Sequence, residues 1–251
     1  MKKVVIFVEG YCEATFLKYL LLLIYNTSFL TISFIKLNTF TDDPFIAPHI
    51  GGDTKLNIQV RIVGNDERVL SSIKDSANNI FLKGWNSIVG LRDMNSAKYE
   101  RELQKQNKTP RTVCDSVNQV FTNLAKQVIL TLPNQDKINL FFSIMEIETW
   151  LLCFYNKYPN IDSRLSLEEI TKTTHINLEE VNLELIFKPS KLIIQIFKII
   201  SRTYSKNIRD ISFLMSAITA EELEIARQKA IAFDGFCKHL SSLQPTSLLE
   251  S

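Results

Sequence analysis

The chain has 251 residues, enough for one large domain or for an ordinary domain with a smaller appended one. Its composition, 45% hydrophobic and 22% charged with only 7 glycines and 7 prolines, is typical of a soluble globular protein and argues against long disordered segments. The net charge of +2 gives no overall basic signature of nucleic-acid binding, and a local basic groove is still compatible with it.

The cysteines, the histidines and the N-terminus argue against a zinc protein or an exported one. Four cysteines and three histidines are scattered without metal-ligand spacing, and Cys114, Cys153 and Cys237 have the apolar neighbours of small core residues. A strand-like run begins directly after MKK, so no signal peptide is expected. The apolar run at 19–25 is too short to span a bilayer, and we predict a buried helix there and a cytoplasmic protein without membrane contact.

The first half of the chain alternates strand and helix patterns. The run VVIFV at 4–8 is continuously apolar, as in a strand that is buried on both faces. In chain order we predict a strand at 3–8, a helix at 12–25, a strand at 32–37, a loop at 38–55, a strand at 56–63, a helix at 66–82 with Asp66 as its N-cap, a strand at 87–91, a helix at 111–130, a strand at 138–144 and a helix at 146–155. This alternation predicts an α/β fold with a mostly parallel sheet flanked by helices.

Beyond residue 156 the strand patterns fade. Segments 177–187, 190–202, 209–217 and 219–240 have mainly helical patterns, and Thr219 with Glu222 fits a capping box at the start of the last one. We therefore predict an α/β domain at 1–156 and a C-terminal helical extension at 157–251.

Three of the predicted strands end in an acidic residue. Glu9 follows the first strand, Asp93 follows the strand at 87–91, and Glu146 follows the strand at 138–144. In an open parallel sheet, ligands bind outside the carboxyl ends of the strands. We therefore expect these three acids at one edge of the sheet, where this architecture builds a site.

The motifs at these positions resemble those of the Toprim fold, which topoisomerases, primases and the nucleases of the overcoming-lysogenization-defect group share. The segment VEGYCE (8–13) resembles the first Toprim motif, and RDMN (92–95) resembles the second, Asp-x-Asp, with Asn95 in place of the second Asp. MEIETWLL (145–152) is similar to the Glu-x-Glu-x-Trp segment of small bacterial Toprim-like proteins, some of them encoded beside phage-defence ATPases. KPS (188–190) and YSK (204–206) also fit that group. The resemblance covers residues 1–156 well and the helical extension more loosely.

This resemblance implies phosphodiester cleavage or transfer assisted by Mg²⁺ or Mn²⁺. Magnesium prefers hard oxygen ligands and keeps several waters, so two or three carboxylates are enough to hold it. Asp93 with Glu146 or Glu148 is expected to hold one metal, with the Asn95 carbonyl oxygen as a further ligand.

The remaining candidates act at a second metal or at the phosphate. Glu9 and Glu13 are expected to bind a second metal, or Glu9 to transfer a proton at a reacting oxygen. Lys206 is expected to stabilise the charge that develops at phosphorus. Asn95 carries one negative charge fewer than Asp, which argues against a tight two-metal site.

Each of these residues also fits an ordinary structural role. Glu146 and Glu148, two positions apart, cannot face the same way on a regular helix, so one of them is expected to be a surface acid that compensates a helix dipole. The corresponding structural roles are a turn for Glu9, a solvated helix position for Glu13, an Asx-turn or helix cap for Asp93, a surface position for Lys206 and a core position for Trp150.

The leading hypothesis is a Mg²⁺-dependent nuclease that cleaves DNA or RNA as the effector of a bacterial anti-phage defence system under the control of a partner ATPase. The alternative is a catalytically degenerate Toprim subunit that acts as a sensor or interaction module. A nucleotide-binding α/β domain is a weak third hypothesis, because no glycine-rich phosphate loop follows any predicted strand. The apolar surface of 19–25 and 190–240 further predicts contact with a partner or with a second copy in a homodimer.

Overall fold

The computed structural model describes residues 1–37, 47–108, 113–216 and 218–244. The strands of this part are β1 (Lys2–Val8), β2 (Leu30–Lys36), β3 (His49–Ile50), β4 (Leu56–Ile62), β5 (Ser87–Asp93) and β6 (Ile138–Ser143). Its helices are α1 (Tyr11–Ile24), α2 (Asp66–Leu82), α3 (Ala97–Lys105), α4 (Asp115–Leu130), α5 (Glu148–Leu152), α6 (Tyr158–Ile161), α7 (Leu167–Thr174), α8 (Pro189–Ile199), α9 (Ile208–Met215), α10 (Ala220–Arg227) and α11 (Ile231–Ser242). Short 3₁₀ turns lie at Thr27–Phe29, Gln135–Lys137, Tyr155–Lys157 and Leu183–Leu185.

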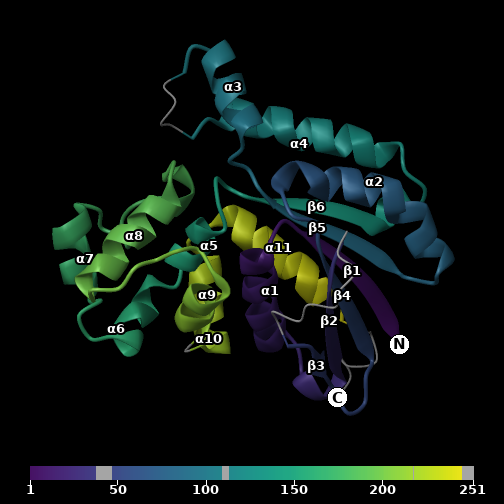
Figure 1. The fold of residues 1–251 in the computed structure, drawn as a ribbon, viewed down its shortest axis with the longest axis horizontal. Helices are drawn as coiled ribbons and strands as arrows, with labels where there is room; N and C mark the ends of the chain where they lie inside the picture. Colours follow the sequence, from purple (N-terminus) through teal and green to yellow (C-terminus); the bar gives the residue numbers. More distant parts are fainter. Residues whose placement is uncertain (38–46, 109–112, 217, 245–251) are drawn as a thin grey trace. The chain divides into compact units, whose positions relative to one another are not determined.

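The strands form one sheet with the order β3-β2-β4-β1-β5-β6 (Figure 1). β1 pairs in parallel with β4 and β5, β2 pairs in parallel with β4, and only the short β3 is shown to run antiparallel to its neighbour, β2. Val8 is in register with Ile62 on one side and Leu91 on the other, so β1, β4 and β5 end at the same edge. The predicted α/β class and mostly parallel sheet are confirmed.

The chain is divided into two compact units. The sheet unit contains Met1–Arg92, Asn118–Phe142 and the chain from Phe236 on, and the helical unit contains Asp93–Val117 and Ser143–Gly235. Among the described residues, no helix has the length and apolarity that crossing a bilayer requires. The predicted division of the chain at residue 156 stays a prediction.

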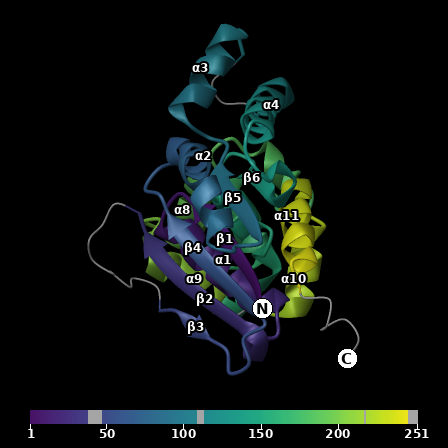
Figure 2. The same cartoon turned by 90° about the vertical axis from the view of Figure 1, so that its right-hand side faces the viewer.

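The core of the sheet unit forms where α2 packs on the sheet. Its buried residues include Val5, Phe7 and Ile88 from the sheet and Val69 and Ile73 from α2. Figures 1 and 2 show α2 and α4 on one side of the sheet and α1 and α11 on the other.

A glycine sets how closely α2 approaches the sheet. A Cβ atom on Gly90 of β5 would lie 2.4 Å from Leu140 Cδ1 and 2.8 Å from Ile73 Cδ1, closer than carbon atoms approach in proteins. On the other side, the Tyr25 hydroxyl donates a hydrogen bond to the Leu240 carbonyl and so ties the end of α1 to α11.

Several details of the first half differ from the sequence-based expectation. The N-cap of α2 is Asn65, whose side chain accepts the Arg68 N–H, so the prediction of Asp66 as the cap is wrong by one residue. The predicted loop at 38–55 contains the short β3, and its residues 38–46 lie outside the described chain, as do residues 111 and 112 at the predicted start of α4. The polar helix α3 was not predicted.

The helical unit confirms some expectations and corrects others. The capping box of Thr219 and Glu222 is present, and Trp150 is a core residue that packs on Phe233. The helix predicted at 177–187 is wrong, because only the 3₁₀ turn Leu183–Leu185 forms there, and the helix predicted at 219–240 is two helices, α10 and α11. Helix α7 was not predicted.

The cysteine expectation holds for two of the three residues. Cys153 and Cys237 are buried, as predicted. Cys114 is only partly buried, so its prediction as a core residue is wrong. It directly precedes α4, where its thiol lies 3.2 Å from the Ser116 hydroxyl at the start of that helix.

Candidate functional site

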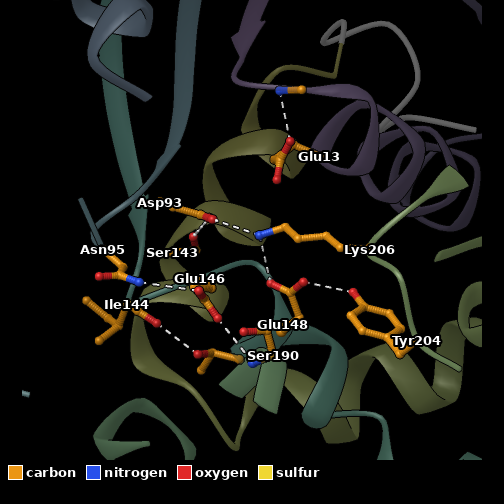
Figure 3. A network of polar contacts seen from close by, with 12 residues as sticks. Glu13, Asp93, Asn95, Ser143, Ile144, Glu146, Glu148, Ser190, Tyr204 and Lys206 are labelled. Atoms are coloured by element: carbon orange, nitrogen blue, oxygen red, sulfur yellow. Dashed lines mark hydrogen bonds and ion pairs between the residues drawn. The ribbon is translucent and has the colours of Figure 1, made fainter. Parts of the chain in front are cut away.

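The ends of two strands supply two polar residues of the candidate site, Asp93 and Ser143, both in the helical unit. Asp93 is the last residue of β5 and Ser143 is the last residue of β6; Asp93 is 5% exposed and Ser143 is fully buried. The Ser143 hydroxyl donates a hydrogen bond of 2.6 Å to Asp93 Oδ1 (Figure 3). Two backbone bonds, Met94 N–H to the Ser143 carbonyl and Asn95 N–H to the Met145 carbonyl, hold the two segments together beyond these residues. The position of Asp93 is therefore fixed by both backbone and side-chain contacts.

The turn between β6 and α5 separates Glu146 from Glu148. Met145 has φ of 66°, the left-handed region that a non-glycine residue rarely adopts, and it is fully buried. Glu146 lies in the turn after this residue and precedes the helix, whereas Glu148 is the first residue of α5. The two carboxylates point to different partners (Figure 3).

Glu148 contacts Lys206 and Tyr204. Its side chain is fully buried, and Oε1 accepts a hydrogen bond of 2.8 Å from the Tyr204 hydroxyl. Lys206 Nζ lies 3.2 Å from Glu148 Oε2 and 3.5 Å from Asp93 Oδ2. The Oε2 atom has no hydrogen bond, so its contact with the ammonium is an ion pair without hydrogen-bond geometry. One ammonium thus lies close to two buried carboxylates that are 55 positions apart in the sequence.

The surroundings of Glu148 act on its charge in opposite directions. Burial is the largest effect and raises the pKa of the Glu148 carboxyl, because the ionised form loses its hydration. Lys206 lowers this pKa through its positive charge, the nearby Glu146 raises it, and the hydrogen bond from Tyr204 lowers it. Lys206 and Tyr204 therefore favour the ionised form that burial disfavours.

Glu146 has a different set of partners. Its Oε2 atom accepts the Ser190 N–H at 3.1 Å, in the first turn of α8, and its Oε1 atom lies 3.3 Å from the Asn95 Nδ2 donor. A carboxylate at the N-terminus of a helix is stabilised by the free N–H groups and by the helix dipole. Glu146 is thus the dipole-compensating acid of the pair, although it compensates α8 and not its own helix.

Glu9 and Glu13 lie in the sheet unit, where β1 turns into α1. Glu13 is buried, and its Oε2 atom accepts the Gly10 N–H at 2.8 Å, so it is not a solvated helix residue. A Cβ atom on residue 10 would lie 3.1 Å from Glu13 Oε2, which explains why glycine fits this close approach. Glu9, partly buried, directly follows the last residue of β1.

The structure thus brings together Asp93, Glu148 and Lys206 directly, and it pairs Asn95 with Glu146. The sequence patterns do not single out Ser143, and Ser190 and Tyr204 stand out only as parts of the KPS and YSK motifs. Ser143 is the last residue of β6, so the strand-end rule that found Asp93 was a signal for it as well.

Comparisons with known proteins identify no relative of this chain. No family model matches the chain, and neither a curated protein nor a solved structure matches it.

Proposed function

We propose that this protein is a Mg²⁺-dependent nuclease that hydrolyses phosphodiester bonds of nucleic acid. The observation that carries the proposal is the contact of Asp93, Glu148 and Lys206, in which two buried carboxylates flank one cation. Buried carboxylates with a perturbed pKa are typical of functional sites, because burial of an ionised group is costly unless the group is paired, hydrogen-bonded or bound to a metal. The similarity of the strand-end motifs to those of the Toprim fold supports the same reaction.

The donor atoms fit a divalent metal. Asp93 and Glu148 supply carboxylate oxygens, the hard ligands that Mg²⁺ and Mn²⁺ prefer. The Lys206 ammonium beside both oxygens supports the view that this place stabilises positive charge. Of the two acids after β6, Glu148 is the better ligand candidate, because its Oε2 atom accepts no hydrogen bond, whereas both oxygens of Glu146 accept one. A bound ion would polarise the scissile phosphate and lower the pKa of a bound water.

The residues of the chain have distinct proposed roles. Ser143 orients Asp93, and Tyr204 orients Glu148, each by one hydrogen bond. Lys206 provides positive charge for the phosphate, and its partly exposed side chain allows the ammonium to contact a substrate. Glu9 and Glu13 are proposed to hold a second ion, or Glu9 to transfer a proton.

The biological setting is proposed from the motifs. The similarity to small Toprim-like proteins encoded beside phage-defence ATPases supports the role of an antiviral effector that a partner ATPase controls, with DNA or RNA as substrate. The near-neutral charge of the chain agrees with dependence on a partner, because weak phosphate neutralisation gives weak nucleic-acid binding.

A degenerate Toprim subunit is the second candidate, and one contact favours it. Asn95 stands where the Toprim motif has a second Asp, and its amide lies next to Glu146, where an Asp would place a second negative charge. A site with this contact has fewer carboxylates for metal. Such a subunit would act as a sensor or interaction module and would cleave nothing.

Cleavage assays with purified protein, with and without its partner, separate the two candidates. The nuclease proposal predicts Mg²⁺-dependent cleavage of DNA or RNA that Asp93→Ala reduces and that excess metal partly restores, because the other carboxylates still form a weak site. For a proton-transfer role of Glu9, Glu9→Gln should lose about 10²–10⁴-fold and should not respond to added metal. A wild-type protein that cleaves neither nucleic acid under any of these conditions would support the degenerate subunit.

A further inference from the structure

The loop between α8 and α9 carries both residues that contact Glu148. Residues 200–207 join the two helices, and within them Tyr204 donates to Glu148 Oε1 while Lys206 lies near Glu148 Oε2. Two residues of this loop, Ser201 with φ of 57° and Lys206 with φ of 49°, are in the left-handed region. Such conformations cost on the order of 1–3 kcal/mol for a non-glycine residue and persist only where other contacts impose them. Contacts with other residues must therefore stabilise this loop conformation.

Asp210, in the first turn of α9, makes such contacts at two points of the loop. Its Oδ2 atom accepts the Ser205 N–H at 2.7 Å, immediately before Lys206, and its Oδ1 atom lies 3.6 Å from the Arg202 guanidinium. Asp210 is 4% exposed, so this carboxylate gives up most of its hydration and is stabilised by these two groups instead. Arg202 is itself held by the Phe213 ring, whose centroid is 3.8 Å from its guanidinium carbon.

An ordinary helix cap does not account for these contacts. Asn207 is the N-cap of α9 and its side chain accepts the Asp210 N–H, so the helix start is already satisfied there. The Asp210 carboxylate reaches back beyond the cap to the backbone that precedes Lys206. A carboxylate in this position fixes the place from which the lysine side chain extends.

We propose that Asp210 is a positioning residue that holds the loop at 200–207, so that Tyr204 and Lys206 meet Glu148 and Asp93. It touches neither carboxylate and acts only through the loop. Its effect on cleavage rests on the proposed nuclease function, whereas its effect on the position of Lys206 does not. Residues that orient the groups of a metal site typically contribute about 10–100-fold to metal affinity or activity.

The experiment measures how fast the Lys206 amine reacts with a limiting amount of an acetylating reagent, by mass spectrometry of the full chain after digestion. Lys198, which is exposed on α8, serves as the internal reference in every sample. Asp210→Ala removes both loop contacts, and Asp210→Asn keeps an oxygen acceptor for the Ser205 N–H. Asp162→Ala is the matched control, because Asp162 also accepts a backbone N–H and pairs with an arginine, Arg164, and neither residue belongs to the loop at 200–207.

The proposal predicts that Asp210→Ala raises the acetylation rate of Lys206 relative to Lys198 by about tenfold or more, as expected for loss of a hydrogen bond to a charged group. Asp210→Asn should show a smaller rise, and Asp162→Ala none. Unchanged Lys206 reactivity in a folded Asp210→Ala variant overturns the proposal. If that variant does not fold, Arg202→Met, which removes one of the two contacts, takes its place with the same criterion.

Cleavage by the same samples distinguishes this proposal from the nuclease proposal. If Lys206 reactivity rises as predicted and the wild-type protein cleaves no nucleic acid, the positioning role holds and the nuclease proposal fails. If the wild-type protein cleaves and Asp210→Ala leaves both Lys206 reactivity and cleavage unchanged, the nuclease proposal holds and the positioning role fails.

Discussion

Glu146 and Glu148 show how two acids of one motif acquire different tasks from their surroundings. Glu146 is half-buried at the N-terminus of α8, where a backbone N–H donates to it. Glu148 is fully buried, and its partners are a tyrosine hydroxyl and a lysine ammonium from the α8–α9 loop. Stabilisation of a helix is the task of the first environment, and binding of a cation suits the second.

Substitution should separate these tasks. Glu148→Gln keeps the shape and the Tyr204 hydrogen bond but removes the charge, so the proposed nuclease function predicts a loss of about 10–100-fold in Mg²⁺-dependent cleavage with little change in stability. Glu146→Ala leaves the Ser190 N–H without its acceptor, so we expect the free energy of unfolding to fall by about 1–3 kcal/mol and cleavage to fall less than in Glu148→Gln. Urea unfolding and initial cleavage rates measure the two effects. The reverse order of the two variants in the cleavage assay would contradict this division.

At the scale of elements, the close contact between α2 and the sheet depends on Gly90. Gly90→Ala would force Leu140 and Ile73 to move, so we expect it to lower the free energy of unfolding by about 1–3 kcal/mol, as overpacking of a core does. Gly235→Ala is the control, because its added Cβ meets no atom within 4 Å apart from its chain neighbours and the backbone of its own helix, and alanine should stabilise α11 by about 0.5–1 kcal/mol. Urea unfolding of both variants tests this. Equal stability of Gly90→Ala and wild type would show that α2 moves away at no cost.

Helix α11 carries a histidine that should make the protein sensitive to acid. Burial lowers the pKa of His239, the positive charge of Lys2 lowers it further, and its Nε2 atom is buried without a hydrogen bond. The ring packs against Phe141. The unfolded chain therefore takes up the proton at a higher pH than the folded one, and the folded state loses stability as the pH falls below the ordinary value of 6.5.

Replacement of His239 by phenylalanine should weaken this pH dependence. The free energy of unfolding, measured by urea between pH 8 and about pH 5, should fall less in His239→Phe than in wild type, because the ionisable group is gone. His175→Phe is the control, since His175 is the C-cap of α7 in the other compact unit. Parallel pH curves for His239→Phe and wild type would show that other groups cause the acid loss.

The elements that could be predicted from the sequence are those whose residues carry a strong periodic or continuous apolar pattern. β1 has five consecutive apolar residues, all fully buried, and α2 has its apolar residues at helical spacing. α3 was missed because only Tyr99 and Leu103 of its residues are buried. The helix predicted at 177–187 is absent, although its apolar residues Leu178 and Leu183 are buried. They are buried in a segment of turns, and apolar spacing alone does not distinguish such a segment from a helix.

The candidate site was predictable in part for the same reason. The strand-end rule located Asp93 and Glu146 without any knowledge of contacts. The partners of Glu148 come from residues more than 50 positions away, and the left-handed Met145 that orients the turn carries no sequence signal, since it is not glycine. Tertiary contacts of this kind appear only when the chain is folded.

At the scale of the whole molecule, the chain passes repeatedly between its two compact units. β5 and β6 belong to the sheet unit up to Arg92 and Phe142, and the next residues, Asp93 and Ser143, belong to the helical unit. The chain thus crosses between the units at Asp93 and at Ser143, the two strand-end residues of the candidate site.

The binding of a divalent ion to Asp93 and Glu148 is the central claim, and titration calorimetry with Mg²⁺, or electron paramagnetic resonance with Mn²⁺, tests it most directly. Wild-type protein should bind the ion, and Asp93→Ala and Glu148→Gln should each weaken binding by about tenfold or more, because each removes one charged oxygen ligand. Asp162→Ala, which removes an acid outside the site, should bind as wild type does. Equal affinity of wild type, Asp93→Ala and Glu148→Gln would contradict the assignment of the site.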